Sequence, residues 1–115
     1  MESEIPSKST GLTASQVVRA QDLVNYQDGA VVSREIAKKP ACSVTLFAFD
    51  EGQGLSEHTT PFDALVQCIE GEVEITIAGQ PHHVSSGEMI LMPGGQAHAL
   101  KALTRFKMIL TMIRS

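Results

Sequence analysis

From Ala30 onward, the chain alternates between short apolar runs and clusters of turn-forming residues. Runs of about 4–8 residues bounded by Gly, Pro, Asn, Asp or Ser favour strands over helices. The sequence predicts about eight or nine strands, with candidates at residues 30–36, 43–49, 55–58, 64–69, 73–77, 82–84, 89–92, 97–101 and 106–113. An open sheet of this size would expose long apolar edges, so we expect an all-β, closed or nearly closed antiparallel structure.

Three turns separate the later strands. They are expected at Ala78–Pro81, Ser85–Gly87 and Pro93–Gly95. Glycine supplies positive φ angles and proline fixes φ near −65°, so these residues bend the chain without chemistry of their own.

The N-terminal region lacks this pattern. Residues 1–14 show no hydrophobic period and are expected to form a flexible tail. Residues 15–25 fit either a turn of helix or a short strand and turn, ending near residues 26–29. With 115 residues and 43% apolar composition, residues 15–115 suffice for one compact domain and leave no room for a second.

The net charge and the spacing of the basic residues limit the classes of binding partner that we expect. The net charge is −4, and the basic residues are scattered apart from the adjacent Lys38 and Lys39, so a nucleic-acid partner is not expected. No apolar run reaches the roughly 18 residues that span a bilayer, and Met1–Glu4 lacks the basic start of a signal peptide. We therefore expect a cytoplasmic protein without a membrane partner.

The two cysteines, Cys42 and Cys68, lie inside apolar strand patterns. A reduced thiol there behaves as a small hydrophobic side chain, so both are interpreted as structural thiols. A redox pair or a metal ligand is the alternative.

Glycines, prolines and histidines recur at spacings that resemble the two motifs of the cupin family. The first motif is Gly, five residues, His, one residue, His, three or four residues, Glu, six residues, Gly. The corresponding positions here are Gly52, His58, Thr60, Ala64 and Gly71. The second motif is Gly, five residues, Pro, one residue, Gly, two residues, His, and it is present as Gly87, Pro93, Gly95 and His98. The resemblance covers about residues 30–113, although Ala102 stands where the family often has Asn.

The resemblance implies a single-domain double-stranded β-helix, or jelly-roll barrel of the RmlC-like type, with a small-molecule pocket at one mouth. In metal-binding members, the two histidines and the glutamate of the first motif join the histidine of the second motif around one divalent ion. That role carries over to His58 and His98 only. Thr60 and Ala64 occupy the pocket positions of the missing His and Glu, so the resemblance implies a degenerate metal centre.

The two-residue period of a β-strand explains the spacing of the first two ligand positions in the first motif. Side chains at i and i+2 face the same way, so the threonine of His58-Thr59-Thr60 keeps the direction of the family's second imidazole but not its donor. Two imidazoles are fewer than the three protein ligands typical of a catalytic zinc or a two-His, one-carboxylate iron site. Any bound Zn, Fe, Mn or Ni is therefore expected to be weak.

Several residues are candidates to supply a missing ligand or to shape the rim. Asp63 is next to Ala64, the position of the missing glutamate, and a bulge would turn its carboxylate inward. His82 and His83 are adjacent, so one of them faces inward if they lie in a strand, and we name His83 as a substitute ligand. Phe62 is expected at the rim, either over the pocket or against a neighbouring subunit.

The last strand suggests an additional interface. Phe106–Ile113 is almost continuously apolar, which is typical of a strand buried on both faces, and the methionines nearby indicate core or interface packing. A lone barrel leaves its outer face in solvent. Because small cupins commonly pair through their outer sheets, we expect a homodimer through the outer strands.

Three functions are consistent with these features. The first is a small-molecule-binding barrel with a degenerate metal centre and no established reaction, in which His58 and His98 are hydrogen-bonded pocket residues. The second is a metal-dependent oxygenase or isomerase that uses His58, His98 and an improvised third ligand, and a metal-free acid/base role is a variant of it. The third is a dimeric ligand-sensing or structural barrel, favoured if Met and Leu side chains fill the pocket.

Overall fold

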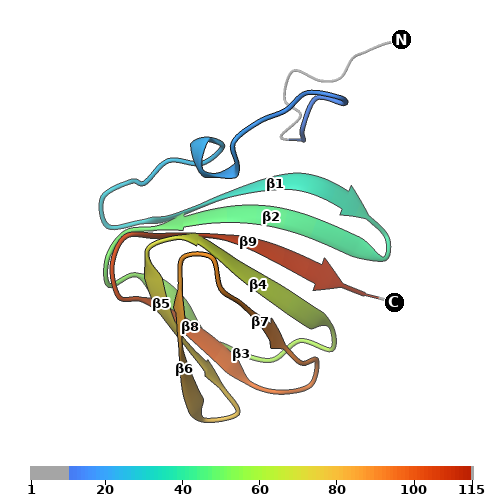
Figure 1. The fold of residues 1–115 in the computed structure, drawn as a ribbon. Helices are drawn as coiled ribbons and strands as arrows, with labels where there is room; N and C mark the ends of the chain where they lie inside the picture. The colour runs from blue at the N-terminus through green and yellow to red at the C-terminus, as the bar shows by residue number, and fades with distance from the viewer. Residues whose placement is uncertain (1–10, 115) are drawn as a thin grey trace.

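The computed structural model describes residues 11–114, which form nine strands in two facing antiparallel sheets (Figure 1). The five-stranded sheet has the order β1-β2-β9-β4-β7, and the four-stranded sheet has the order β3-β8-β5-β6. The strands are β1 Val31–Lys39, β2 Cys42–Phe49, β3 Gly54–His58, β4 Asp63–Glu70, β5 Glu72–Ile77, β6 Gln80–Ser85, β7 Met89–Met92, β8 His98–Ala102 and β9 Phe106–Ile113. The predicted all-β, single-domain fold is confirmed.

The interior between the sheets follows the two-residue period of the strands. In β5, Val73, Ile75 and Ile77 are buried while Glu72 and Glu74 are exposed. The same alternation brings Phe49 and Phe106 into contact, with their ring centroids 5.2 Å apart. The space between the sheets is therefore a packed apolar core.

The turn at Ala78–Gly79 joins β5 to β6 through only two residues. Both have positive φ, 49° at Ala78 and 81° at Gly79. Two positive φ angles in succession are typical of the hairpin turn whose twist matches the flanking strands, and this turn fixes the pairing of Ile77 with Gln80.

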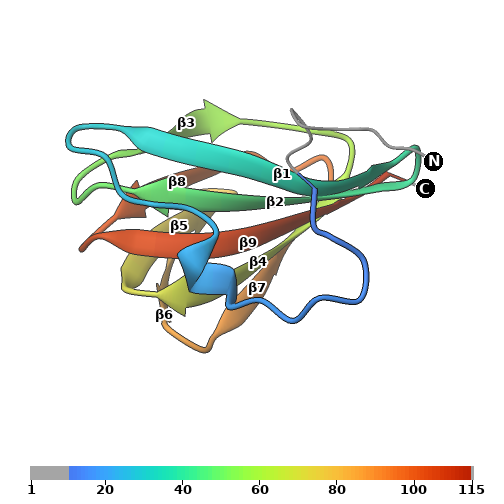
Figure 2. The same ribbon diagram turned by 90° about the horizontal axis from the view of Figure 1, so that it is seen from above.

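An N-terminal arm, which we define as residues 20–26, crosses the outer face of the five-stranded sheet (Figure 2). Its only regular element is the 3-10 turn η1, Ala20–Asp22, so the open choice between helix and strand is resolved as a single helical turn. Val24 is buried against Leu46 and Ala48. The arm therefore covers part of the sheet face that the sequence left without a cover.

The arm is held by polar contacts as well as by packing. The Lys107 ammonium, on a 7% exposed residue, donates to the Gln21 carbonyl at 2.6 Å and lies 4.8 Å from the centre of the Tyr26 ring. The Tyr26 hydroxyl donates to Glu70 at 2.5 Å, and burial, followed by this hydrogen bond, raises the pKa of the phenol. A buried ammonium needs such partners, so we infer that Lys107 and Tyr26 anchor the arm.

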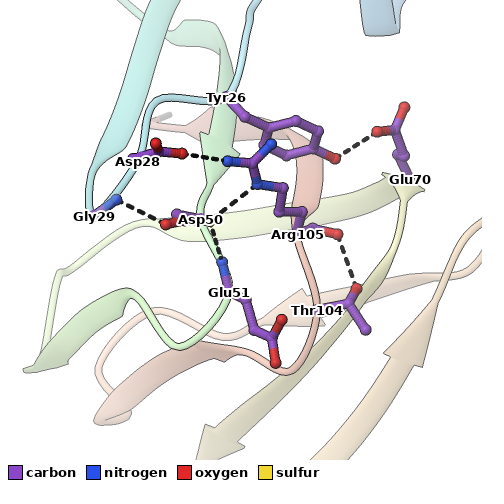
Figure 3. A network of polar contacts seen from close by, with 8 residues as sticks. All are labelled: Tyr26, Asp28, Gly29, Asp50, Glu51, Glu70, Thr104 and Arg105. Carbon is purple, nitrogen blue, oxygen red and sulfur yellow. Dashed lines mark hydrogen bonds and ion pairs between the residues drawn. The ribbon is translucent and has the colours of Figure 1, made fainter.

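Arg105 extends this anchor into a wider network (Figure 3). It donates to Asp28 at 2.6 Å and to Asp50 at 3.0 Å, and its guanidinium lies 5.2 Å from the centre of the Tyr26 ring. Asp50 also accepts from the Gly29 amide, and this contact is the main reason that the pKa of Asp50 is lowered. The network ties the loop after the arm to the β8–β9 connection.

Burial decreases along β9 from its first residues to its last. Phe106, Lys107 and Met108 are buried, whereas Ile113 is 41% exposed. The expectation that β9 is buried on both faces therefore holds in its first half only. Cys42 is half-buried, Cys68 is buried in the core, and both are free thiols.

The expected tail is only partly described, because residues 1–10 lie outside the described residues, while residues 11–14 are exposed. Within residues 11–114, no helix has the length and apolar character to cross a membrane.

Candidate functional site

Two histidines meet at one end of the barrel. His58 ends β3, His98 begins β8, and the two residues are cross-strand partners. Their Nε2 atoms are 3.1 Å apart, and the rings lie edge to face with centroids 4.4 Å apart. His98 is 4% exposed, whereas His58 is exposed, so the pair spans the boundary between core and solvent.

A bulge in β3 produces this meeting. Leu55 pairs with Leu100 and His58 pairs with His98, so three steps along β3 match two steps along β8. Leu55 packs against the core, and a residue three positions later in a regular strand would face the opposite way. The extra residue returns the imidazole of His58 to the interior face, where His98 lies.

Hydrogen bonding orients both rings. The Nδ1 of His58 lies 2.7 Å from the Ser56 carbonyl oxygen, and the Nδ1 of His98 lies 3.2 Å from that of Gln96. A carbonyl oxygen only accepts, so each contact needs a proton on Nδ1. Both Nε2 atoms then direct lone pairs at each other.

The contact between the two Nε2 atoms depends on which ring nitrogens carry protons. With both Nδ1 atoms protonated, the contact between the two Nε2 atoms is favourable only if a third proton or a metal ion joins them. Burial and then the neighbouring His58 lower the pKa of His98, so a positive charge on that ring is disfavoured. The pair therefore offers Nε2 lone pairs to a hydrogen-bond donor or a cation.

Thr60 and Ala64, the positions of the missing family ligands, supply no donor to the pair among the contacts of the described residues. The Thr60 hydroxyl donates to the Phe62 carbonyl at 3.1 Å and accepts from the Phe62 amide at 3.3 Å. Ala64 is buried in the core with a methyl side chain. Thr60 instead stabilises the loop between β3 and β4, and its own carbonyl also accepts from the Gly95 amide at 2.7 Å.

Asp63 and Phe62 shape the rim. The Asp63 carboxylate accepts from the Gly94 amide at 2.8 Å and so joins the start of β4 to the turn before β8. Gly94 packs directly on this loop, since an added Cβ would lie 2.5 Å from the Pro61 carbonyl oxygen. The half-buried Phe62 ring lies beneath the Arg114 guanidinium at 5.8 Å.

The two adjacent histidines of β6 face opposite ways. His83 is exposed and contacts Glu72 at 2.9 Å, so it is not brought to the pair. His82 pairs with the buried Ile75, and its Nδ1 is the only buried side-chain nitrogen or oxygen without a hydrogen-bond partner among the described residues. Sequence reasoning named His83 and missed the inward His82, although His82 shares the strand parity of the apolar Val84.

The donor set can be compared with what a metal ion needs. At metal–nitrogen distances of about 2.0–2.1 Å, the 3.1 Å separation corresponds to an angle of about 100° at the metal. However, residues 11–114 contain no group of three His, Cys, Asp or Glu side chains that could hold an ion. The residues therefore do not fit a resident ion with the usual three protein ligands.

Comparisons with known proteins agree with this architecture. Residues 45–114 match the family model described as Cupin domain. No curated protein matches the chain significantly. A conserved protein of unknown function from Streptococcus pyogenes has a similar structure, with a TM-score of 0.88 at 29% identity over 97% of this chain and 98% of that chain.

Two further solved structures are similar. A cupin superfamily protein from Desulfitobacterium hafniense has a TM-score of 0.86 at 23% identity, covering 95% of this chain and 100% of that chain. A cupin 2 conserved barrel domain protein from Leptotrichia buccalis is 34% identical, with a TM-score of 0.79. The match covers 82% of this chain and 46% of that chain. The matched family model covers more than half of the sequence, and the chain therefore belongs to the cupin family.

Proposed function

We propose that this cupin barrel binds a small molecule at the mouth that holds His58 and His98, and that its metal centre is degenerate. The observation that carries the proposal is the 3.1 Å contact between two Nε2 atoms whose rings are fixed by backbone carbonyls, without a third ligand among residues 11–114. Orientation by carbonyls is typical of imidazoles that present Nε2 to a partner.

The pair has the chemistry to recognise a polar ligand. Imidazole donates or accepts a proton near neutral pH, and the exposed His58 is open to a ligand while the buried His98 supports it. The aliphatic surroundings, including Ile77 opposite His98, suit the apolar part of a ligand.

A metal-dependent enzyme, an oxygenase or isomerase, is the second candidate. It is favoured by the separation of the two nitrogens, which matches neighbouring positions on one Zn, Fe, Mn or Ni ion. The ligand itself would then have to complete the coordination, because Asp63 is bonded to Gly94 and His83 to Glu72.

A ligand-sensing or structural barrel is the third candidate. Met92, Met108 and Leu100 are at most 4% exposed inside the barrel, so its own side chains fill much of the interior. This packing favours a shallow site at the mouth rather than a deep cavity.

Metal analysis and ligand screening of untagged protein distinguish these candidates. We expect sub-stoichiometric metal that is unchanged in His58→Ala, together with small molecules that raise the melting temperature of the wild type but not of His98→Ala. His83→Ala is the matched control and should respond like the wild type. One metal ion per chain, lost in His58→Ala, would favour the enzyme, and ligand stabilisation that persists in His98→Ala would contradict binding at the pair.

A further inference from the structure

We propose that a second site, a basic groove lined by Lys38, Lys39, Pro40 and Arg114, binds a small oxyanion. The basic groove has a volume of about 380 Å³, enough for a small carboxylate or phosphate compound. It is built from residues outside the histidine pair.

Three elements converge to form the basic groove. Lys39 ends β1, the hairpin turns into β2, and Arg114 directly follows β9. The Arg114 amide donates to the Ala41 carbonyl at 2.7 Å, which fixes the end of β9 against the hairpin. Figures 1 and 2 show the hairpin and the end of β9 at the same end of the barrel as the loop from β3 to β4.

The basic groove is positively charged, whereas the whole chain carries a net negative charge. The net charge is −4, yet three cations and no carboxylate line the groove. Within residues 11–114, Lys38, Lys39 and Arg114 have no acidic partner, whereas Arg105 pairs with Asp28 and Asp50. Cations gathered without counter-charges repel one another, and a bound anion removes that repulsion.

Arg114 is held in place before any ligand arrives. Its guanidinium donates to the hydroxyl of the buried Ser43 at 2.9 Å and to the Lys39 carbonyl at 3.4 Å, and it lies over the Phe62 ring. These contacts use two of the five guanidinium N–H groups, so donors remain for a ligand. A fixed guanidinium loses little entropy when it binds an oxyanion through paired hydrogen bonds.

The groove favours a small oxyanion over a polymer. A nucleic acid needs a basic stripe that follows its backbone, but only Lys38 and Lys39 are adjacent in a chain whose other basic residues are scattered. The lysines supply charge and the arginine supplies geometry, which suits either a carboxylate or a phosphate group.

NMR titration of the full chain tests the site, with inorganic phosphate and malonate as probes and chloride at equal ionic strength as the reference. We expect both probes to shift the amides of residues 38, 39, 41 and 114 with saturation, and chloride to shift them less. A larger effect of phosphate or of malonate would identify the preferred group. Shifts no larger than with chloride, or shifts spread over the whole chain, would overturn the proposal.

Three substitutions localise the binding. Lys39→Met and Arg114→Gln should each weaken the apparent affinity about five-fold, the effect of removing one nearby charge. Lys101→Met changes the net charge equally at an exposed position of β8 and should leave the affinity unchanged. Equal weakening by Lys101→Met, or none by Lys39→Met and Arg114→Gln, would contradict the site.

The histidine pair is tested separately in the same experiment. His58→Ala should retain wild-type phosphate affinity, because the basic groove does not include it. Loss of phosphate binding in His58→Ala would overturn the independence of the two sites.

Discussion

His82 combines a buried imidazole nitrogen with apolar neighbours. Its Nδ1 has no partner, and its cross-strand neighbour is the fully buried Ile75. An unsatisfied buried polar group costs about 1–3 kcal/mol, so an apolar replacement of similar size should remove that cost. We expect His82→Leu to raise the free energy of unfolding by about 1 kcal/mol, measured by chemical denaturation.

The adjacent histidine provides the control. His83 is exposed and its ion pair with Glu72 is a surface contact, so His83→Leu should change stability by less than about 0.5 kcal/mol. If His82→Leu destabilised the protein more than His83→Leu, the imidazole of His82 would have a stabilising role that its contacts do not show.

The thiol of Cys68 makes the free energy of unfolding depend on pH in the alkaline range. Burial raises the pKa of its thiol from 9.0 to about 11. The unfolded chain therefore loses this proton first, and stability falls as pH rises from about 9 toward 11. We expect the free energy of unfolding to drop by about 1 kcal/mol more in the wild type than in Cys68→Ala between about pH 8 and about pH 10.

Comparison with Cys68→Ala removes the other groups that titrate in this range, such as Tyr26, since they are common to both proteins. Identical pH profiles of denaturation for the two proteins would show that the thiol is as exposed to water in the folded state as in the unfolded chain.

At the scale of elements, the N-terminal arm is attached to the sheet by apolar packing together with the contacts of Lys107 and Tyr26. Val24 is 4% exposed and packs against Leu46 and Ala48, so Val24→Ala should lower the free energy of unfolding by about 2 kcal/mol through lost burial and an unfilled space. Val17→Ala, at a residue that is 97% exposed, should have no measurable effect. Equal denaturation midpoints for Val24→Ala and the wild type would mean that the arm is detached in solution.

The nine strands could be predicted because each is a short apolar run between turn residues, and such local patterns survive folding. The arm could not be predicted, since residues 20–26 have no period and their position depends on Leu46 and Ala48, distant in the chain. Some strand ends differ from the predicted ones by a few residues. The first strand was predicted at residues 30–36, and β1 extends to Lys39.

The site was predictable in part for the same reason. The motif spacings identified His58 and His98, but the bulge that turns His58 inward follows from its register with β8. The Asp63 contact with Gly94 also joins residues far apart in sequence, so only the structure could locate that carboxylate.

At the scale of the whole molecule, the outer face of the five-stranded sheet is only partly covered by the arm. Val44 and Leu65 flank Thr111 on neighbouring strands, and Leu65 pairs with Leu91 on the edge strand β7. These residues form a row across four strands that is apolar except for Thr111, and Leu91 is 48% exposed at its end. An exposed apolar surface that ends on an edge strand is suitable for self-association.

We propose that a second copy of the chain covers this row and forms a homodimer through the outer strands. Size-exclusion chromatography with light scattering should give twice the mass of one chain. Leu91→Lys should shift the protein to monomer, because it places a charge in the apolar contact. Leu103→Lys, at a 39% exposed residue in the β8–β9 connection, should remain dimeric. A monomeric wild type, or a dimer that survives Leu91→Lys, would contradict an interface at this row.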